Sequence, residues 1–290
     1  MRLFKPDCYA IITTNETRFD LSPVSEATNR RLDMSFNVFA TSASEPNDGE
    51  CTIYNLTETT RNRISEGSKI EVYAGYDGNY KLISAGDIET VNNRKPSTDW
   101  ATTISWGDGV RAYVDVNFSK SYKEGVKVSD ILNDLTGSLG LAVNSVSSQL
   151  TEVLNGGLSV NGKTKDILNT ITKDYGLEWS IQDEEVRVIT QGAPIDNQAI
   201  VISQETGLLE FPQITEKGVD FVCQLNPDIR PSKIVNIKSV GSTRSLSADP
   251  AAAPLQESAN GLQLVENVRF SGDNFGGAFQ SKVRAVQYNA

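Results

Sequence analysis

The stretch Asp130–Leu141, with the sequence DILNDLTGSLGL, recurs 36 residues further on as Asp166–Leu177, DILNTITKDYGL. In both copies the apolar side chains fall within one arc of an α-helix, as in an amphipathic helix with one buried face. A glycine precedes the final leucine of each copy, and glycine commonly ends a helix in the left-handed conformation. The repeat predicts two helices in a small duplicated α/β element, because two copies are too few for a solenoid. Chance recurrence in two ordinary helices is the alternative.

Short strands are expected to follow both helices. After the second copy, a polar turn separates Glu178–Ile181 from Glu185–Val188, which predicts a hairpin. After the first copy, Leu141–Val143 is a weaker strand candidate. We therefore assign residues 119–192 to a duplicated α/β region.

The sequence on both sides of this region predicts strands. In residues 1–118, polar and apolar residues alternate over 32–38, and Asp77-Gly78 predicts a hairpin turn. The strictest alternation is Val110–Phe118, which predicts a half-buried strand. In residues 193–290 the strand candidates are Ala199–Ile202, Val219–Leu225, Ile234–Ile237, Leu262–Phe270 and Phe279–Val286.

The composition excludes several classes of enzyme. The 290 residues contain 27 Lys and Arg against 37 Asp and Glu, for a net charge of −10, and they include no histidine. Ser-His-Asp and Cys-His nucleophile systems and imidazole zinc sites are therefore excluded. The surplus of acids also disfavours a protein that holds nucleic acid, because that affinity comes largely from Lys and Arg contacts to phosphates. Carboxylate chemistry, as in glycosidases, stays possible.

The cysteines and the apolar runs exclude further classes of protein. Cys8, Cys51 and Cys223 are far apart and odd in number, so a complete disulfide framework and a CxxC metal site are excluded. Cys223 occupies an apolar position of an alternating strand, where we expect a small buried side chain. No apolar run approaches the roughly 20 residues of a membrane-spanning helix, and the first residues lack the apolar stretch of a signal peptide. We expect no metal, no cofactor and no membrane insertion.

Two stretches suggest chemical sites at first sight. Gly272–Gly277, GDNFGG, could cradle a phosphate, but a strand follows it and no Lys-Ser/Thr is attached, so a hairpin turn is favoured. Asp183–Glu185 places three carboxylates on a turn, where exposure would not raise the pKa of a general acid. We expect neither to be catalytic, although the sequence does not exclude a carboxylate pair elsewhere.

Arg61 and Arg63 form one of the densest basic places in the chain. They lie on a short helix predicted over Glu58–Ile64, for which Thr57 is the N-cap. These arginines could contact an acidic partner or a neighbouring copy of the chain. The alternative is a solvated helix face.

Several short motifs follow one another along almost the whole chain. They are Cys51–Thr57 with Thr60–Arg63, Ile70–Tyr76, Gly86–Ile88, the DILN helix ending at Gly140-Leu141, Glu205–Leu208, Asn226–Pro231 and Gly272–Gly277. Their order resembles that of the baseplate hub proteins of tailed bacteriophages, the late control protein D-like tail hub subunits. One departure is Val268–Phe270, where a histidine is common in the family.

The resemblance implies a mainly β fold in which two β-barrel-like hub domains, residues 1–118 and 193–290, flank the α/β region. It implies a non-enzymatic subunit of the tail baseplate, assembled in the host cytoplasm and carried in the virion. Three copies would form a ring with six similar positions around the DNA channel, without stable nucleic-acid binding. The ring would meet the sixfold tail tube or a distal tail protein on one side and a threefold central spike on the other.

We expect Arg61, Arg63, Phe270 and Phe275 at interfaces with other subunits or with these partners. A carbohydrate-binding or cell-wall-degrading tail module is the alternative function, because such modules are also β-rich and acidic. A secreted adhesin domain is a third possibility, and it would require a signal peptide and a stable monomer.

Overall fold

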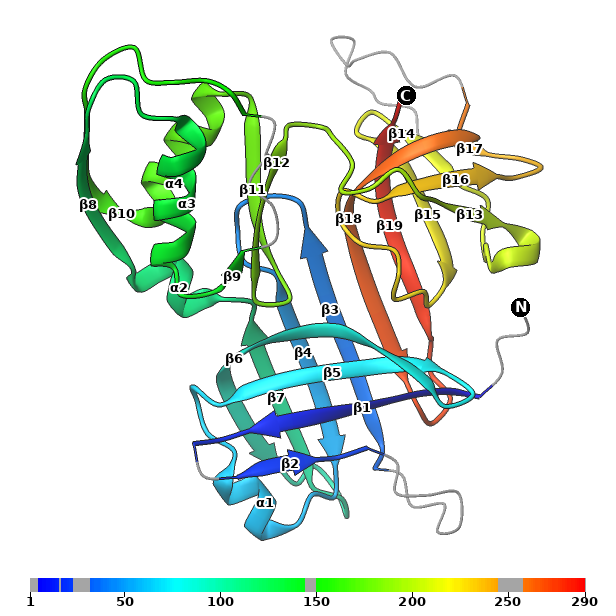
Figure 1. Cartoon of the computed structure of the whole chain (residues 1–290). Coiled ribbons are helices and arrows are strands. Elements are labelled where there is room, and N and C mark those ends of the chain that lie inside the picture. Colours follow the sequence, from blue (N-terminus) through cyan, green and yellow to red (C-terminus); the bar gives the residue numbers. More distant parts are fainter. Residues whose placement is uncertain (1–4, 16, 23–31, 144–149, 245–257, 290) are drawn as a thin grey trace. The chain divides into compact units, whose positions relative to one another are not determined.

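The computed structural model describes residues 5–15, 17–22, 32–143, 150–244 and 258–289 (Figure 1). Strands make up 50% of it and helices 14%, which confirms the predicted mainly β class.

The contacts divide the chain into two units. The first unit comprises Met1–Thr41, Asp48–Trp106 and Pro194–Ala290, and the second comprises Ser42–Asn47 and Gly107–Ala193. Both terminal β regions therefore belong to one unit. The division into three domains, with boundaries after residues 118 and 192, stays a prediction.

The first unit is built from strands of both terminal regions. From the N-terminal region come β1 (Pro6–Thr13), β2 (Arg18–Asp20), β3 (Met34–Thr41), β4 (Asp48–Tyr54), α1 (Glu58–Arg63), β5 (Lys69–Tyr76), β6 (Asn79–Arg94) and β7 (Ala101–Gly107). From the C-terminal region come β13 (Ala199–Ser203), the 3-10 helix η1 (Gln204–Thr206), β14 (Gln213–Thr215), β15 (Gly218–Gln224), β16 (Ile234–Lys238), β17 (Thr243–Arg244), β18 (Gly261–Asp273) and β19 (Gln280–Gln287).

These strands form one sheet, but the sheet does not close on itself. Its hydrogen-bonded order is β17-β14-β15-β19-β18-β3-β4-β7-β6-β5-β1-β2, with β16 on β18 and β13 on β16. The terminal strands β2 and β17 are only three and two residues long, and short edge strands limit further pairing. Among the described residues the predicted barrel-like closure is therefore absent.

Strand β18 joins the two terminal regions. It lies beside β3 (Figure 1). Its first residues pair with β16, whereas Asn267–Asp273 pair with β3, so that Arg269 lies opposite Phe39 and Phe270 opposite Val38. Buried side chains of both regions, Val38 and Phe270 among them, form one hydrophobic core. Because apolar burial is the main stabilising term in folding, this shared core holds the regions together as one folded unit.

Two local predictions for the first unit are confirmed. Asp77 and Gly78 have φ values of 50° and 81° and connect β5 to β6, as a two-residue hairpin turn requires. Helix α1 follows Thr57, whose hydroxyl accepts a hydrogen bond from the backbone N–H of Thr60.

The second unit contains the predicted repeat. Its elements are α2 (Val110–Asp115), β8 (Asn117–Tyr122), α3 (Val128–Ser138), β9 (Ala142–Val143), β10 (Leu158–Lys163), α4 (Thr164–Asp174), β11 (Leu177–Gln182) and β12 (Glu185–Thr190). Helices α3 and α4 confirm the two amphipathic copies, and Leu132 and Leu168 are fully buried at equivalent positions. Gly140 and Gly176 end the copies at φ values of 70° and 64°, the left-handed conformation that glycine favours.

The strand predicted over Val110–Phe118 is wrong. This stretch forms α2 and the start of β8. The reason lies in Gly109, whose left-handed φ of 65° turns the chain before the helix. The site also requires glycine, because an added Cβ would meet Ile181 at 2.9 Å. Only Ala112 is buried in the helix, and Val114 is 39% exposed. The alternation therefore does not mark a buried strand face.

Candidate assembly site

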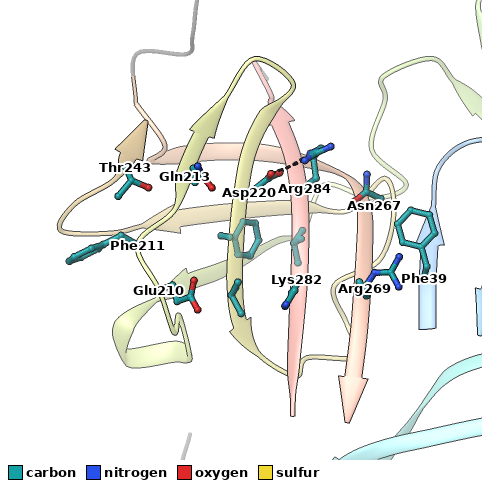
Figure 2. Close-up of a pocket in the computed structure, with 13 residues that line it drawn as sticks. Phe39, Glu210, Phe211, Gln213, Asp220, Thr243, Asn267, Arg269, Lys282 and Arg284 are labelled. Atoms are coloured by element: carbon teal, nitrogen blue, oxygen red, sulfur yellow. Dashed lines mark hydrogen bonds and ion pairs between the residues drawn. The ribbon is translucent and has the colours of Figure 1, made fainter. Parts of the chain in front are cut away.

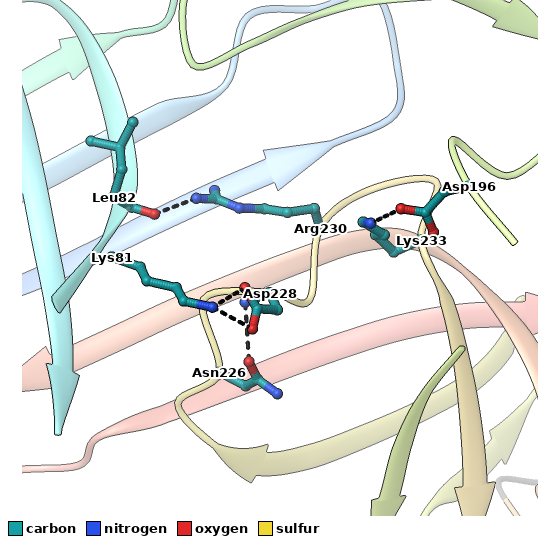
Figure 3. Close-up of polar contacts among 7 residues, drawn as sticks. All are labelled: Lys81, Leu82, Asp196, Asn226, Asp228, Arg230 and Lys233. Carbon is teal, nitrogen blue, oxygen red and sulfur yellow. Dashed lines mark hydrogen bonds and ion pairs between the residues drawn. The ribbon is translucent and has the colours of Figure 1, made fainter. Parts of the chain in front are cut away.

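A loop of the C-terminal region is attached to strand β6 of the N-terminal region (Figure 3). Lys81 Nζ donates to both carboxylate oxygens of Asp228 at 2.7 Å. The backbone N–H of Asp228 donates in turn to Asn226 Oδ1 at 3.0 Å, which orders the start of the loop. We call this loop, residues 226–233, the clamp.

Arg230 makes a second contact between the clamp and β6. The β5–β6 register skips Ile83, which forms a β-bulge. The Arg230 guanidinium donates to the carbonyl of Ile83 at 2.6 Å and to that of Leu82 at 2.5 Å. It also lies 5.4 Å from the ring centre of Phe270. One side chain thus caps the carbonyls of the bulge and covers an aromatic core residue.

The predicted interface residues lie in different environments. Phe270 is fully buried beneath Arg230, so its prediction as an interface residue is corrected: it is a core residue with no surface for a partner. Its alternation with Val268, also fully buried, is the signal for this burial.

Arg61 makes contacts within its own chain. Its guanidinium lies 4.1 Å from the ring centre of Trp100, and Nη1 donates to the carbonyl of Leu56 at 2.5 Å. Arg63, on the same helix, is exposed. Arg61 therefore stabilises the α1 region, and Arg63 presents its charge to solvent.

Phe275 is exposed on the hairpin between β18 and β19, which confirms the turn predicted at Gly272–Gly277. We call residues 272–277 the tip. Phe275 is 64% exposed, and its backbone N–H donates to Asp273 Oδ1 at 2.7 Å. Asn274 fixes the tip to the sheet, because its side chain accepts from the N–H of Met34 at 3.0 Å and donates to the carbonyl of Leu32 at 2.9 Å.

A groove of about 520 Å³ lies over β3, β18, β19 and β15 (Figure 2). Phe39 and Phe211 line it, and Phe211 is 55% exposed. In its floor Arg284 and Asp220 form a bidentate ion pair, with both nitrogen–oxygen distances at 2.7 Å. This surface could not be found from the sequence, because its residues come together only through strand pairing.

Two further cations border the groove. Arg269 and Lys282 are paired in the β18–β19 register and point to the same face. Arg269 lies 5.1 Å from the ring centre of Phe39 and donates to Asn37 Oδ1 at 3.1 Å. Within the described part of the chain, neither cation forms an ion pair with a carboxylate.

One buried carboxylate, Asp108, was missed by sequence reasoning. It is 1% exposed and accepts hydrogen bonds from the backbone N–H groups of Asp183 at 2.6 Å and Glu184 at 2.7 Å. The side-chain amide of Asn47 adds a third donor at 3.3 Å. Burial raises the pKa of Asp108 to about 7, and these donors limit the rise.

This arrangement gives the acidic turn a structural role. Asp183 and Glu184 have positive φ values of 55° and 64°, as in a tight hairpin turn. Their backbone N–H groups point at Asp108, so the Asp108 carboxylate holds the β11–β12 hairpin in the second unit.

The described residues include three buried thiols and no cluster of metal ligands. They contain no group of three or more Cys, Asp or Glu side chains arranged to hold a metal ion. All three cysteines are buried thiols, and burial raises the pKa of Cys223 to about 12, far from thiolate formation at neutral pH. In the same described ranges, no helix combines the length and apolar character needed to span a bilayer.

Solved structures with a similar fold include two tail proteins and a type VI secretion component. The 43 kDa tail protein of prophage MuSo2 from Shewanella oneidensis matches with a TM-score of 0.63 and 8% identity over 96% of both chains. A tail protein from Neisseria meningitidis MC58 matches with a TM-score of 0.64 and 10% identity over 97% of this chain and 96% of that one. The E. coli c3393 protein, a type VI secretion component, matches with a TM-score of 0.57 and 9% identity over 91% of this chain and 76% of that one. The fold is therefore that of phage tail proteins.

The family follows from the sequence itself. The model of the baseplate hub gp41 family matches residues 14–241, which is most of the chain. The chain belongs to the baseplate hub gp41 family, as the order of its motifs indicated, and this family is a structural component of the phage tail. A search of curated proteins finds no match to this sequence.

Proposed function

We propose that three copies of this chain form the ring of a tail baseplate hub. The ring adapts a sixfold tail tube, or a distal tail protein, to a threefold central spike and surrounds the ejection channel. The observation that favours this most is the single sheet in which β18 of the C-terminal region pairs with β3 of the N-terminal region. Two β regions held side by side in each copy could supply six positions from three chains.

Each subunit of the proposed ring contains the three predicted domains. Residues 1–118 and 193–290 act as the two hub domains, and residues 119–192 form the α/β region between them in the sequence. Arg61, Arg63 and Phe275 are the surface residues proposed for contacts with other subunits or partners. The clamp supports this role, because it fixes the two hub domains to each other within one chain.

A non-enzymatic role is part of the proposal. The absence of histidine from the sequence and the high pKa of the buried thiol of Cys223 support it. Asp108, the buried carboxylate with the most strongly raised pKa, is engaged by backbone donors of a hairpin. Incubation of the purified chain with peptidoglycan tests this point, and measurable turnover would favour the alternative of a cell-wall-degrading module.

The proposed partners are tail proteins. The c3393 protein is described as structurally similar to the T4 bacteriophage tail proteins gp27 and gp5, which supports an association with tube and spike components here. The net charge of −10 supports a channel wall that does not bind DNA stably. The chain would assemble in the host cytoplasm and remain in the virion.

The experiment is a mass measurement by light scattering on the purified chain, alone and mixed with its tube or spike neighbour. A threefold assembly is expected in at least one of these mixtures. A monomer in every mixture would contradict the proposal.

A further inference from the structure

We propose that the tip of one copy inserts Phe275 into the groove of a second copy, and that this contact joins neighbouring subunits. The inference rests on the homotrimer proposed above and names the two surfaces that form its subunit contact.

The tip has the properties of an anchor. Phe275 is a large apolar side chain that is 64% exposed, and exposed aromatic residues commonly dominate the binding energy of protein interfaces. Its turn is already ordered by the Asp273 contact to the Phe275 N–H and by Asn274, which bonds to the start of β3 and to Leu32. A preorganised turn loses little conformational freedom on binding, so more of the contact energy appears as affinity.

The groove has the size and lining to receive an aromatic ring. Its volume of about 520 Å³ lies within the range of ligand sites and exceeds what a phenyl side chain needs. Phe39 and the exposed Phe211 provide apolar surface at the two ends of the groove, so an inserted ring would pack against one of them. In Figure 2 these rings lie at opposite ends of the groove, and Lys282 and Arg269 lie along one edge.

The groove carries a surplus of one positive charge, which favours an acidic occupant: its charged lining residues are Arg269, Lys282 and Arg284 against Asp220 and Glu210. Arg269 and Lys282 are both exposed, and they face each other across a strand pair. Like charges directly opposite each other destabilise a sheet unless an opposite charge lies nearby. In the tip, Asp273 is two residues from Phe275, and its carboxylate has acceptor capacity beyond the single N–H bond to that residue. One tip therefore supplies both the ring and the acid.

The contact is heterologous, because the tip and the groove are different surfaces of the same chain. Each copy offers one tip and one groove, so the contact can repeat from copy to copy and closes into a ring where the rotation permits. A second copy is thus the occupant that the charges and the exposed ring favour. A segment of another tail protein is the competing occupant.

The experiment uses full-length variants that each damage one surface. Phe275→Ala removes the ring of the tip, and Arg269→Glu with Lys282→Glu reverses the charge at the groove. The control is Arg94→Glu with Lys123→Glu, which makes the same charge change at two other exposed positions. Thermal unfolding and circular dichroism establish that each variant is folded, and light scattering over a concentration series measures assembly.

We expect the wild type and the control to form trimers and each surface variant to associate roughly thirtyfold more weakly or not at all. Mixing the two surface variants should restore dimers but no trimers, because only one intact tip–groove pair can form between them. If both surface variants form trimers as readily as the wild type does, the tip–groove contact is overturned and the hub proposal still stands. A wild type that is monomeric alone and in every partner mixture would overturn both.

Discussion

At the scale of single residues, the polar side chains of Asp108 and Arg230 have structural partners that the sequence does not reveal. Asp108 accepts from two backbone N–H groups of a hairpin, and Arg230 donates to two carbonyls of a β-bulge. Both sets of partners are far away in the sequence, so spacing along the chain gives no signal for either. Phe270 could have been assigned correctly, because it alternates with buried Val268 on β18.

Asp108 should make stability depend on pH. Its folded pKa of about 7 lies above the roughly 3.9 of an unfolded aspartate. Between these values the folded chain holds a proton that the unfolded chain has lost, so stability falls as the pH rises from about 4 to 7. We expect a loss on the order of a few kcal/mol over this interval, because one pKa unit corresponds to about 1.4 kcal/mol.

Chemical denaturation from pH 4 to pH 8 measures this loss, with Asp108→Asn as the reference. The variant has no titrating group at this position, so the stability of the wild type relative to it should decline across the interval. A constant difference between the two proteins would contradict the role of Asp108.

Arg230→Ala should destabilise the first unit by about 2–4 kcal/mol. The change leaves the carbonyls of Leu82 and Ile83 without this donor and uncovers Phe270. Denaturation by urea measures the loss. Lys81→Ala is the matched control, because its ion pair with Asp228 is more than half exposed on both sides and should contribute only about 0–1 kcal/mol. Equal effects of the two variants would refute the role of the clamp.

At the scale of elements, local sequence patterns predicted the helices and turns whose conformation depends on nearby residues. The DILN repeat, the glycines that end its helices and the Asp77-Gly78 turn all correspond to observed features. The strand prediction for Val110–Phe118 was wrong, because alternating polar and apolar residues are also compatible with a short helix. The left-handed turn at Gly109 starts helix α2 there. The groove could not be predicted, since it requires the pairing of β3 with β18 over more than two hundred residues.

The two glycines of the repeat should be sensitive to substitution. Gly140→Ala and Gly176→Ala each place a side chain in the left-handed conformation and should cost about 1 kcal/mol in the free energy of unfolding. Gly137→Ala is the control, because Gly137 lies in α3 with open space around it and should gain about 0.5–1 kcal/mol. Denaturant titrations of all three variants measure these changes. A gain at Gly140 or Gly176 would contradict their role as helix-ending residues.

At the scale of the whole molecule, the resemblance in motif order predicted the family, whereas composition alone only excluded classes of protein. The net charge and the missing histidine excluded much enzyme chemistry but named no partner. Among the described residues, β2 and β17 end the strand order without pairing to each other, so the barrel-like expectation is corrected to an open sheet.

Substitutions of the two arginines of α1 should affect assembly and stability differently. Arg63→Glu reverses an exposed charge, so we expect several-fold weaker assembly at an unchanged unfolding midpoint. Arg61→Glu should also destabilise the chain by about 1–3 kcal/mol, because it loses the Leu56 hydrogen bond and the contact with Trp100. Sedimentation and thermal unfolding give the two readouts. If Arg63→Glu assembles as the wild type does, Arg63 belongs to a solvated face.

The most direct measurement is electron microscopy of the assembled particle formed by the chain with its tail neighbours. The account predicts a ring of three copies in which the strands of the N-terminal region and those of the C-terminal region alternate around six similar positions. A particle with a single copy, or a ring in which the two regions occupy unrelated surroundings, would contradict it.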